Sequence, residues 1–186
     1  HAGSTPMNMR QDALVAASEI VLAVNRIGNT SGQQVATVGK LQVTPNAPNV
    51  IPGEVEMSLD IRDLSNEHLD HLMAELLENI KAIATRTQTE IKLEPFLRNE
   101  PAPAAPQIQN TIAQVCEDLE LSYTYLPSRA SHDAQEMINL TDMGMIFVPS
   151  IGGISHSQTE YTSPEQCVAG ANVLLQTFLR LDQHYS

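Results

Sequence analysis

Tryptophan is absent from the sequence, and aromatic residues make up only 4% of it. A core must therefore be built from alanine, valine, isoleucine, leucine and methionine. The apolar share of 42% over 186 residues is sufficient for one domain or two small ones. No stretch approaches the roughly 18 consecutive apolar residues that a membrane-spanning helix needs. The sequence therefore predicts a globular chain without a membrane partner.

Positive charge is also scarce. Ten lysine and arginine residues stand against 22 aspartate and glutamate residues, which gives a net charge of -12, and the basic residues form no cluster. Such a surface repels nucleic acid and anionic membranes, so we expect neither as a partner. The only cysteines, Cys116 and Cys167, stand in helix-like contexts. We expect them to be reduced and, because no segment has the pattern of a secretory signal, we expect a cytoplasmic protein.

Hydrophobic periodicity predicts an incomplete split β-α-β arrangement in the first half. The expected order is a helix capped by Asp12, two strands, a helix capped by Ser65 and a further strand. The three strands are predicted over Gln33–Thr44, Val55–Ile61 and Glu90–Leu97. A ferredoxin-like fold has one more strand, which would precede His1. Since the chain also begins without methionine, we expect it to be part of a longer protein.

The second half alternates between helical and strand-like patterns. It follows a proline- and alanine-rich stretch, Asn99–Pro106, which predicts a domain boundary. The expected elements are a helix over Gln107–Leu119, a strand over Ser122–Leu126, a helical segment over Gln135–Leu140, a strand over Met143–Val148 and a closing helix from Ser163 to about Leu181. This alternation predicts an α/β layer with a parallel sheet. Because the half is short for a doubly wound domain, we expect the C-terminal part of one.

Two histidines are set among small residues and are candidates for chemistry. His156 follows the turn Gly152-Gly153 and could ligate a metal. A loop histidine bonded to a backbone carbonyl is the simpler interpretation of its spacing, because no HxH, HxxxH, HExxH or CxxC pattern is present. His132 precedes Asp133, which could orient the imidazole ring or cap the following helix, and the local pattern favours the cap.

Asn49 and Arg62 flank the predicted hairpin of the first half. A guanidinium binds a carboxylate through two parallel hydrogen bonds, so this pair is a reasonable clamp for a substrate carboxylate. A surface ion pair of Arg62 with Asp60 or Asp63 explains the pattern equally well.

Four motifs in the same order resemble the zinc-dependent N-carbamoyl-L-amino-acid hydrolase family. They read HAGSTPMNMRQDALVAA, PNVIPGEVEMSLDIRD, SRASHDAQ and MIFVPSIGGISHSQTE. This family includes allantoate amidohydrolase and β-ureidopropionase and belongs to the aminoacylase-like M20 peptidase clan. The resemblance covers nearly the whole chain and does not decide among the members. It implies hydrolysis, by metal-activated water, of a carbamoyl or ureido C–N bond in an N-carbamoyl-L-amino acid or an allantoate-like substrate that carries a carboxylate.

The resemblance also implies a fold. Residues 1–98 would form a ferredoxin-like lid and dimerisation domain without its first strand, and residues 99–186 the C-terminal part of an aminopeptidase-like α/β catalytic domain. The complete enzyme would hold two divalent metal ions, zinc or alternatively manganese, cobalt or nickel, and would be a homodimer joined through the lid. The HxD and Glu-Glu pairs that hold these metals in the family are not in this chain. We therefore expect the chain alone to retain no metal and no activity.

Individual roles follow from the matching positions. His156 resembles the last zinc ligand of the family, and His132 the histidine that contacts the substrate near the scissile carbon. His1 resembles the lid histidine that polarises the substrate carbonyl in the active site of the partner subunit. Asn49 and Arg62 resemble the pair that holds the substrate α-carboxylate.

One position departs from the family. Ser131 stands where a glycine is usual, and serine would strain the loop if the backbone there needs a positive φ. Two alternatives to the carbamoyl hydrolase remain: an aminoacylase or dipeptidase of the same clan, and a non-catalytic dimerisation fragment.

Overall fold

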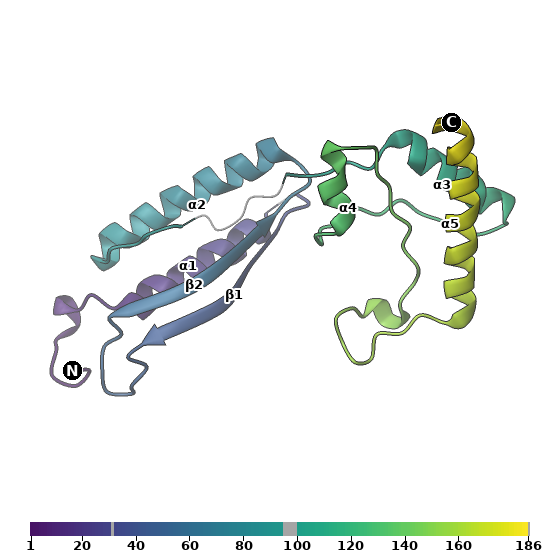
Figure 1. Cartoon of the computed structure of the whole chain (residues 1–186). Helices are drawn as coiled ribbons and strands as arrows, with labels where there is room; N and C mark the ends of the chain where they lie inside the picture. The colour runs from purple at the N-terminus through teal and green to yellow at the C-terminus, as the bar shows by residue number, and fades with distance from the viewer. Residues whose placement is uncertain (31, 95–99, 186) are drawn as a thin grey trace. The chain divides into compact units, whose positions relative to one another are not determined.

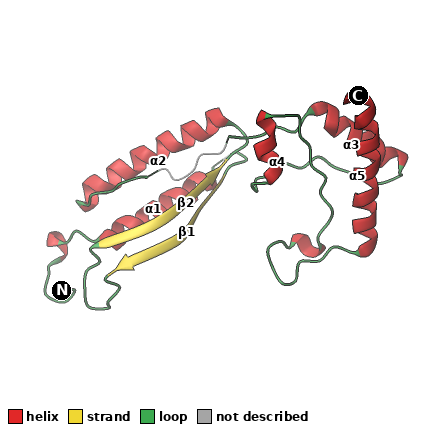
Figure 2. Ribbon diagram, viewed as in Figure 1, coloured by secondary structure: helices red, strands yellow, loops and turns green. Residues whose placement is uncertain are grey.

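The computed structural model describes residues 1–30, 32–94 and 100–185. It divides into two compact units, His1–Pro101 and Ala102–Ser186 (Figures 1 and 2). The lid and catalytic roles expected for the two halves of the chain stay predictions. Within the described ranges, every helix is too short or too polar to cross a bilayer.

The N-terminal unit packs two helices against one face of a two-stranded antiparallel sheet (Figure 2). Its elements are the 3-10 turn η1 (Met7–Met9), α1 (Ala13–Gly28), β1 (Val35–Thr44), β2 (Glu54–Arg62) and α2 (Asn66–Thr87). The sheet register pairs Val35 with Arg62 at one end and Thr44 with Glu54 at the other, with an irregularity at Gly39. The predicted helices and hairpin of this unit are confirmed.

The core of this unit follows from the two periodicities of its sequence. The helices contribute the fully buried residues, which are Ala16, Ile20, Val24, Ile27, Leu72, Leu76, Ile80 and Ile83. Alternation along β2 turns Met57, Leu59 and Ile61 toward those helices. The Asp12 carboxylate accepts hydrogen bonds from the amides of the first turn of α1, as expected for an N-cap.

The junction between β2 and α2 is held by Asp63. Its carboxylate accepts hydrogen bonds from the Ser65 amide (2.8 Å) and from Nδ1 of His68 (2.8 Å). Burial raises the pKa of the Asp63 carboxyl, but these hydrogen bonds outweigh burial, so its pKa lies below the ordinary value. Ser65 also caps α2 by accepting from the His68 amide, as predicted. The ionised form of Asp63 therefore stabilises the start of α2.

The third strand predicted for this unit does not form in the described residues. Residues 90–94 have no strand structure, and the rest of the predicted strand lies outside the described residues. An extended segment becomes a strand only when a neighbouring backbone completes its hydrogen-bond ladder. Ile91 instead packs its side chain against the helical core. The hydrophobic pattern of this segment therefore indicated correctly that Ile91 is packed against the core, but it did not indicate whether the backbone pairs with a strand.

The C-terminal unit is built on two helices that pack together, α3 (Pro106–Asp118) and α5 (Pro164–Tyr185). In the sequence, three short elements separate α3 from α5: α4 (Asp133–Glu136), η2 (Met137–Asn139) and η3 (Ile151–Gly153). The buried core is small and consists of Val115, Cys116 and Val173, with Ile112, Leu121 and Ile146 packed against it.

The parallel sheet predicted for this unit is wrong for the described residues. Neither Ser122–Leu126 nor Met143–Val148 has strand structure. Both segments are apolar, and Leu126 and Phe147 are 65% and 50% exposed. Their sequences suit strands, and the Met143 carbonyl accepts one hydrogen bond from the Ala105 amide at 2.8 Å. A single bond is not a ladder, so neither segment forms a strand within the described part of the unit. The mixed helix and strand composition of the whole chain agrees with the predicted α/β class.

The core of the N-terminal unit can be tested at two neighbouring leucines of α2. Leu76 is 0% exposed and Leu77 is 39% exposed. Leu76→Ala is expected to lower the free energy of unfolding by about 2–5 kcal/mol, because it removes buried methyl groups and leaves a cavity. Leu77→Ala, the matched control, is expected to cost less than about 1 kcal/mol. Equal losses in chemical denaturation would contradict the proposed orientation of α2.

The Asp63 junction makes a pH-dependent prediction. Asp63→Asn is expected to lower the free energy of unfolding at neutral pH by about 1–2 kcal/mol, since it weakens two hydrogen bonds to a charged group. Because the folded pKa of Asp63 is depressed, its stabilisation is complete above the unfolded pKa, near 4, and is lost as pH falls through the folded pKa. The stability difference between wild type and variant should therefore shrink below about pH 4.

The control for this measurement is Glu78→Gln, which removes an exposed charge paired with Lys81 on the same helix. We expect it to change stability by less than about 0.5 kcal/mol at either pH. A difference between wild type and Asp63→Asn that stays constant from neutral to acid pH would show that the Asp63 charge does not contribute.

Candidate functional site

The N-terminal loop lies beside the loop that joins β1 to β2, so His1 and Asn49 are brought to the same end of the hairpin (Figure 1). The Ala2 amide donates to the Asn49 carbonyl at 2.9 Å, and the Thr5 amide donates to the His1 carbonyl at 3.1 Å. Both His1 and Asn49 are exposed. Two residues that are 48 positions apart in the sequence therefore share one exposed edge.

The His1 ring is oriented by the backbone. Its Nδ1 accepts a hydrogen bond from the Gly3 amide at 3.1 Å. A nitrogen that accepts from an amide carries no proton, so the neutral ring is protonated on Nε2. Arg10 closes the loop: its guanidinium donates to the Thr5 carbonyl at 3.0 Å and to the Ala2 carbonyl at 2.5 Å. The loop thus presents an N–H donor at its surface.

Arg62 lies at the opposite end of the hairpin from Asn49. It pairs in register with Val35, whereas Asn49 belongs to the loop that begins after Thr44. Since β2 has nine residues, its ends are on the order of 25 Å apart. One chain therefore does not bring Asn49 and Arg62 together around one carboxylate.

The Arg62 guanidinium forms a two-point ion pair with Asp60. Nε of Arg62 lies 2.9 Å from Oδ1 of Asp60, and its terminal nitrogen lies 2.7 Å from Oδ2. The hydrogen bond from Arg62 lowers the pKa of the Asp60 carboxyl below its ordinary value. Of the two interpretations that the sequence left open, the ion pair with Asp60 is present, and it presents a preformed guanidinium at the end of β2.

His132 occupies the N-cap position of α4, which was predicted for Asp133. Asp133 is the first residue of the helix instead. The ring of His132 is held by Ser128, whose Oγ lies 2.7 Å from Nε2, and by Phe147, whose ring is 6.0 Å away in an edge-on arrangement. Ser128 was missed in the sequence analysis, although its position four residues before His132 in SRASH was a usable signal.

The backbone at Ser131 does not have the positive φ that a glycine would favour. The described non-glycine residues with positive φ are Asn46, Gln88, Glu120 and His156. The strain expected from serine in this loop is therefore not found.

His156 does have a left-handed backbone, with φ of 55°. It follows Gly152 and Gly153, whose φ values are also positive, and its amide donates to Oε2 of Glu160 at 2.8 Å. A non-glycine residue in this conformation is uncommon and is often found at functional sites. The imidazole is exposed at the surface of the loop. Its donor chemistry suits a divalent metal, for which it would supply one of the three or four ligands that such an ion needs.

Across the ranges that the structure describes, no three histidine, cysteine, aspartate or glutamate side chains converge in a way that could hold a metal ion. The predicted residues are instead distributed over four places: His1 with Asn49, Arg62 with Asp60, the loop that carries His132, and the loop that carries His156.

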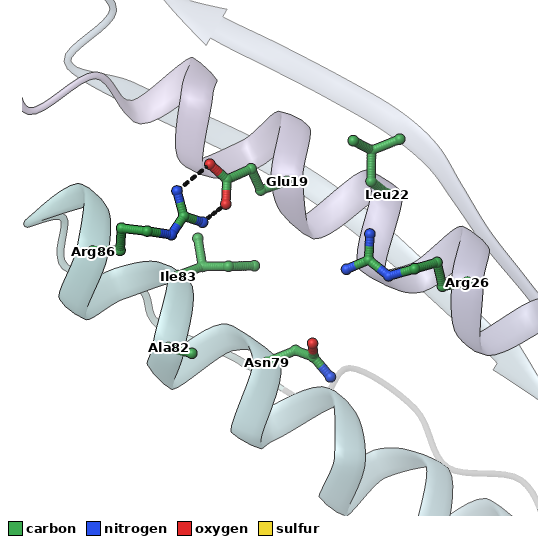
Figure 3. A pocket seen from close by; sticks show the side chains of 7 residues that line it. All are labelled: Glu19, Leu22, Arg26, Asn79, Ala82, Ile83 and Arg86. Carbon is green, nitrogen blue, oxygen red and sulfur yellow. Dashed lines mark hydrogen bonds and ion pairs between the residues drawn. The ribbon is translucent and has the colours of Figure 1, made fainter.

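A shallow groove of about 210 Å³ lies between α1 and α2 (Figure 3). It is lined by Glu19, Leu22, Arg26, Asn79, Ala82, Ile83 and Arg86. Its main polar feature is the ion pair of Arg86 with Glu19, in which one nitrogen lies 2.7 Å from the carboxylate. None of the predicted site residues lines this groove. We interpret the ion pair as a brace between the two helices.

Comparison with known proteins places these features in a family. Residues 7–180 match the peptidase family M20/M25/M40. The chain is 35% identical, over 98% of its own length and 45% of the relative's, to an N-carbamoyl-L-amino acid amidohydrolase of Geobacillus stearothermophilus. It is 33% identical, over 94% of its length and 43% of the relative's, to the allantoate amidohydrolase of Escherichia coli.

A solved structure agrees with these sequence matches. An amidase of the hydantoinase/carbamoylase family from Burkholderia multivorans superposes with a TM-score of 0.89 at 38% identity, over 97% of this chain and 44% of that one. The chain thus spans less than half the length of the relatives that it matches. Because the family match extends over nearly the whole chain, and the four ordered motifs predicted the same assignment, the chain belongs to the peptidase family M20/M25/M40.

Proposed function

We propose that the complete protein is a metal-dependent amidohydrolase that cleaves a carbamoyl or ureido C–N bond of a small substrate with a carboxylate. N-carbamoyl-L-amino acids and allantoate-like compounds are the candidate substrates. One observation carries the proposal: the chain is 35% identical to a protein named N-carbamoyl-L-amino acid amidohydrolase. The residues whose roles are inferred from the resemblance of the motifs are His1, Asn49, Arg62, His132 and His156. A cytoplasmic location is part of the proposal, and both cysteines are free thiols.

The imidazole of His156 would be one ligand of the metal centre. Two divalent ions, zinc or alternatively manganese, cobalt or nickel, would supply an activated water and an electrophile when bound. The remaining ligands would come from the part of the protein that this chain does not include. His156 fits the role because its ring is exposed on a loop where Gly152 and Gly153 allow a tight turn and Glu160 accepts a hydrogen bond from the His156 amide.

The other residues would bind the substrate and stabilise charge. The Nε2–H of His1 would donate to the carbonyl oxygen as negative charge develops on it. His132 has its Nε2 bonded to Ser128, which leaves Nδ1 for contact near the scissile carbon. Arg62 and Asn49 would fix the substrate carboxylate, so that the reacting carbon is held in one place.

This arrangement requires two copies of the chain. Asn49 and Arg62 lie at opposite ends of one hairpin, so a single substrate can contact both only if they come from different copies. We therefore propose a homodimer formed through the N-terminal unit. Apolar side chains are exposed on α1 and β1 of this unit: Val15 at 48%, Leu22 at 58%, Val35 at 41% and Leu41 at 46%. A two-stranded sheet also leaves its outer backbone edges open for pairing.

An aminoacylase or dipeptidase is the second candidate, because the matching family is named for peptidases. The two candidates differ in the bond cleaved. The third, a non-catalytic dimerisation fragment, applies to this chain taken alone.

A substrate panel tests the proposal on the complete protein. We expect turnover of N-carbamoyl-L-amino acids or allantoate, and none of N-acetyl amino acids or dipeptides. His1→Ala is expected to lower kcat about a hundredfold to a thousandfold, because it removes a donor to the developing oxyanion. His71→Ala, which changes an exposed histidine of α2, is the matched control and should leave kcat unchanged.

Turnover of acetyl or peptide substrates alone would establish the aminoacylase or dipeptidase instead. The 186-residue chain assayed by itself with zinc should be inactive, since a single imidazole ligand cannot hold two metal ions. Zinc-dependent turnover by that chain would contradict the placement of the missing ligands.

The homodimer makes a separate prediction. Leu41→Lys places a charge at an exposed leucine of β1 and should shift the chain toward monomer in light scattering, because the charge would be buried in the proposed interface. Leu77→Lys, at a similarly exposed leucine of α2, is the control and should leave the dimer intact. A wild-type chain that stays monomeric at high concentration would exclude association through this unit.

A further inference from the structure

Arg10 folds the N-terminal loop back on itself. Its side chain is half-buried and donates from Nε to the Thr5 carbonyl at 3.0 Å and from a terminal nitrogen to the Ala2 carbonyl at 2.5 Å. The two acceptors are three positions apart and belong to the turn that begins at His1. One guanidinium thus connects the end of the loop to both sides of that turn.

The partners of Arg10 are unlike those of other arginines in the chain. Arg62, Arg86 and Arg180 pair with the carboxylates of Asp60, Glu19 and Asp118. A chain with 22 acidic side chains offers carboxylates widely, yet Arg10 donates to backbone carbonyl oxygens. Charged donors to backbone acceptors fix local backbone geometry, because the acceptor cannot move without the chain. Arg10 therefore acts on the shape of the loop.

The loop shape in turn fixes the His1 ring. The Gly3 amide that donates to Nδ1 of His1 follows Ala2, whose carbonyl is held by Arg10. A β-carbon at position 3 would lie 3.3 Å from Cε1 of the ring, so the ring rests against this backbone. On its other side, the Ala2 amide is bonded to Asn49. The orientation of the ring and its choice of tautomer therefore depend on a turn that Arg10 closes.

We propose that Arg10 is a positioning residue for His1: through the Ala2 and Thr5 carbonyls it holds the loop in the form that protonates His1 on Nε2 and presents this N–H to the substrate. Arg10 itself does not touch the substrate. This inference rests on the proposed function in one respect only, namely that the His1 N–H donates to the carbonyl oxygen of the substrate. A displacement of about 1 Å in a positioned group can cost a hundredfold in rate, so loosening the loop has a measurable effect.

The structural consequence is tested on the 186-residue chain by NMR. In the wild type, long-range proton–nitrogen correlations should show the His1 ring protonated on Nε2, and the Gly3 amide should exchange slowly. Arg10→Ala should mix the two tautomers and speed exchange of the Gly3 amide by about tenfold. Arg10→Lys, which keeps the charge but offers one nitrogen instead of the fork, should restore this only in part. The matched control is Arg26→Ala, at an exposed arginine of α1, and should match the wild type.

The kinetic consequence is tested on the complete protein. Arg10→Ala should lower kcat about tenfold to a hundredfold with little change in KM, and should add nothing when combined with His1→Ala. A variant that matches the wild type in both the tautomer and the Gly3 exchange rate would overturn the proposal, as would additive losses in the double variant. If the wild type hydrolyses none of the panel substrates, the proposed function fails, while the NMR comparison still decides the role of Arg10.

Discussion

The contact between α1 and α2 is the interaction on which the N-terminal unit depends. Leu76 and Val24 are almost completely inaccessible, and the helices that carry them cover one face of the hairpin. This contact fixes which face of β2 is buried. It thereby determines where the hairpin ends lie, with the loop that carries Asn49 at one end and Arg62 at the other. Asn49 and Arg62 lie outside this core, but the hairpin that the core holds carries both of them.

The sequence was informative wherever structure is local. The stripe of apolar residues in α2, the Asp12 and Ser65 caps and the alternation along β2 each depend on a few neighbouring residues, and each was predicted correctly. Positions that depend on distant backbone were not predictable in the same way. The bond from Ala2 to Asn49, which joins the His1 loop to the hairpin loop, has no counterpart in periodicity or spacing. Motif resemblance grouped His1, Asn49 and Arg62 by role, but only the strand register showed that one chain separates Arg62 from the other two.

In the C-terminal unit, an apolar sequence pattern did not lead to the strand that it predicted. Met143–Val148 has the composition of a buried strand, yet it forms no strand, and its Phe147 is 50% exposed. Phe178 of α5, in the same unit, is 71% exposed. The composition of a segment reports what surrounds it in the complete fold. The relatives of this chain are more than twice as long as the part that it matches. His132 packs against Phe147 of this segment, so a candidate site residue lies beside exposed apolar side chains.

The length of β2 sets the spacing between Asn49 and Arg62, the two residues proposed to bind the substrate carboxylate. Side chains alternate between the two faces of a strand, so the hairpin can lengthen or shorten without turning its apolar face outward only in steps of two residues. Each such step moves Arg62 relative to the Asn49 loop by about 7 Å. The distance is therefore adjustable only coarsely, and fine adjustment falls to the side chains at the ends and to irregularities such as that at Gly39. A hairpin of this kind keeps the distance between its two ends constant even when the side chains at those ends change.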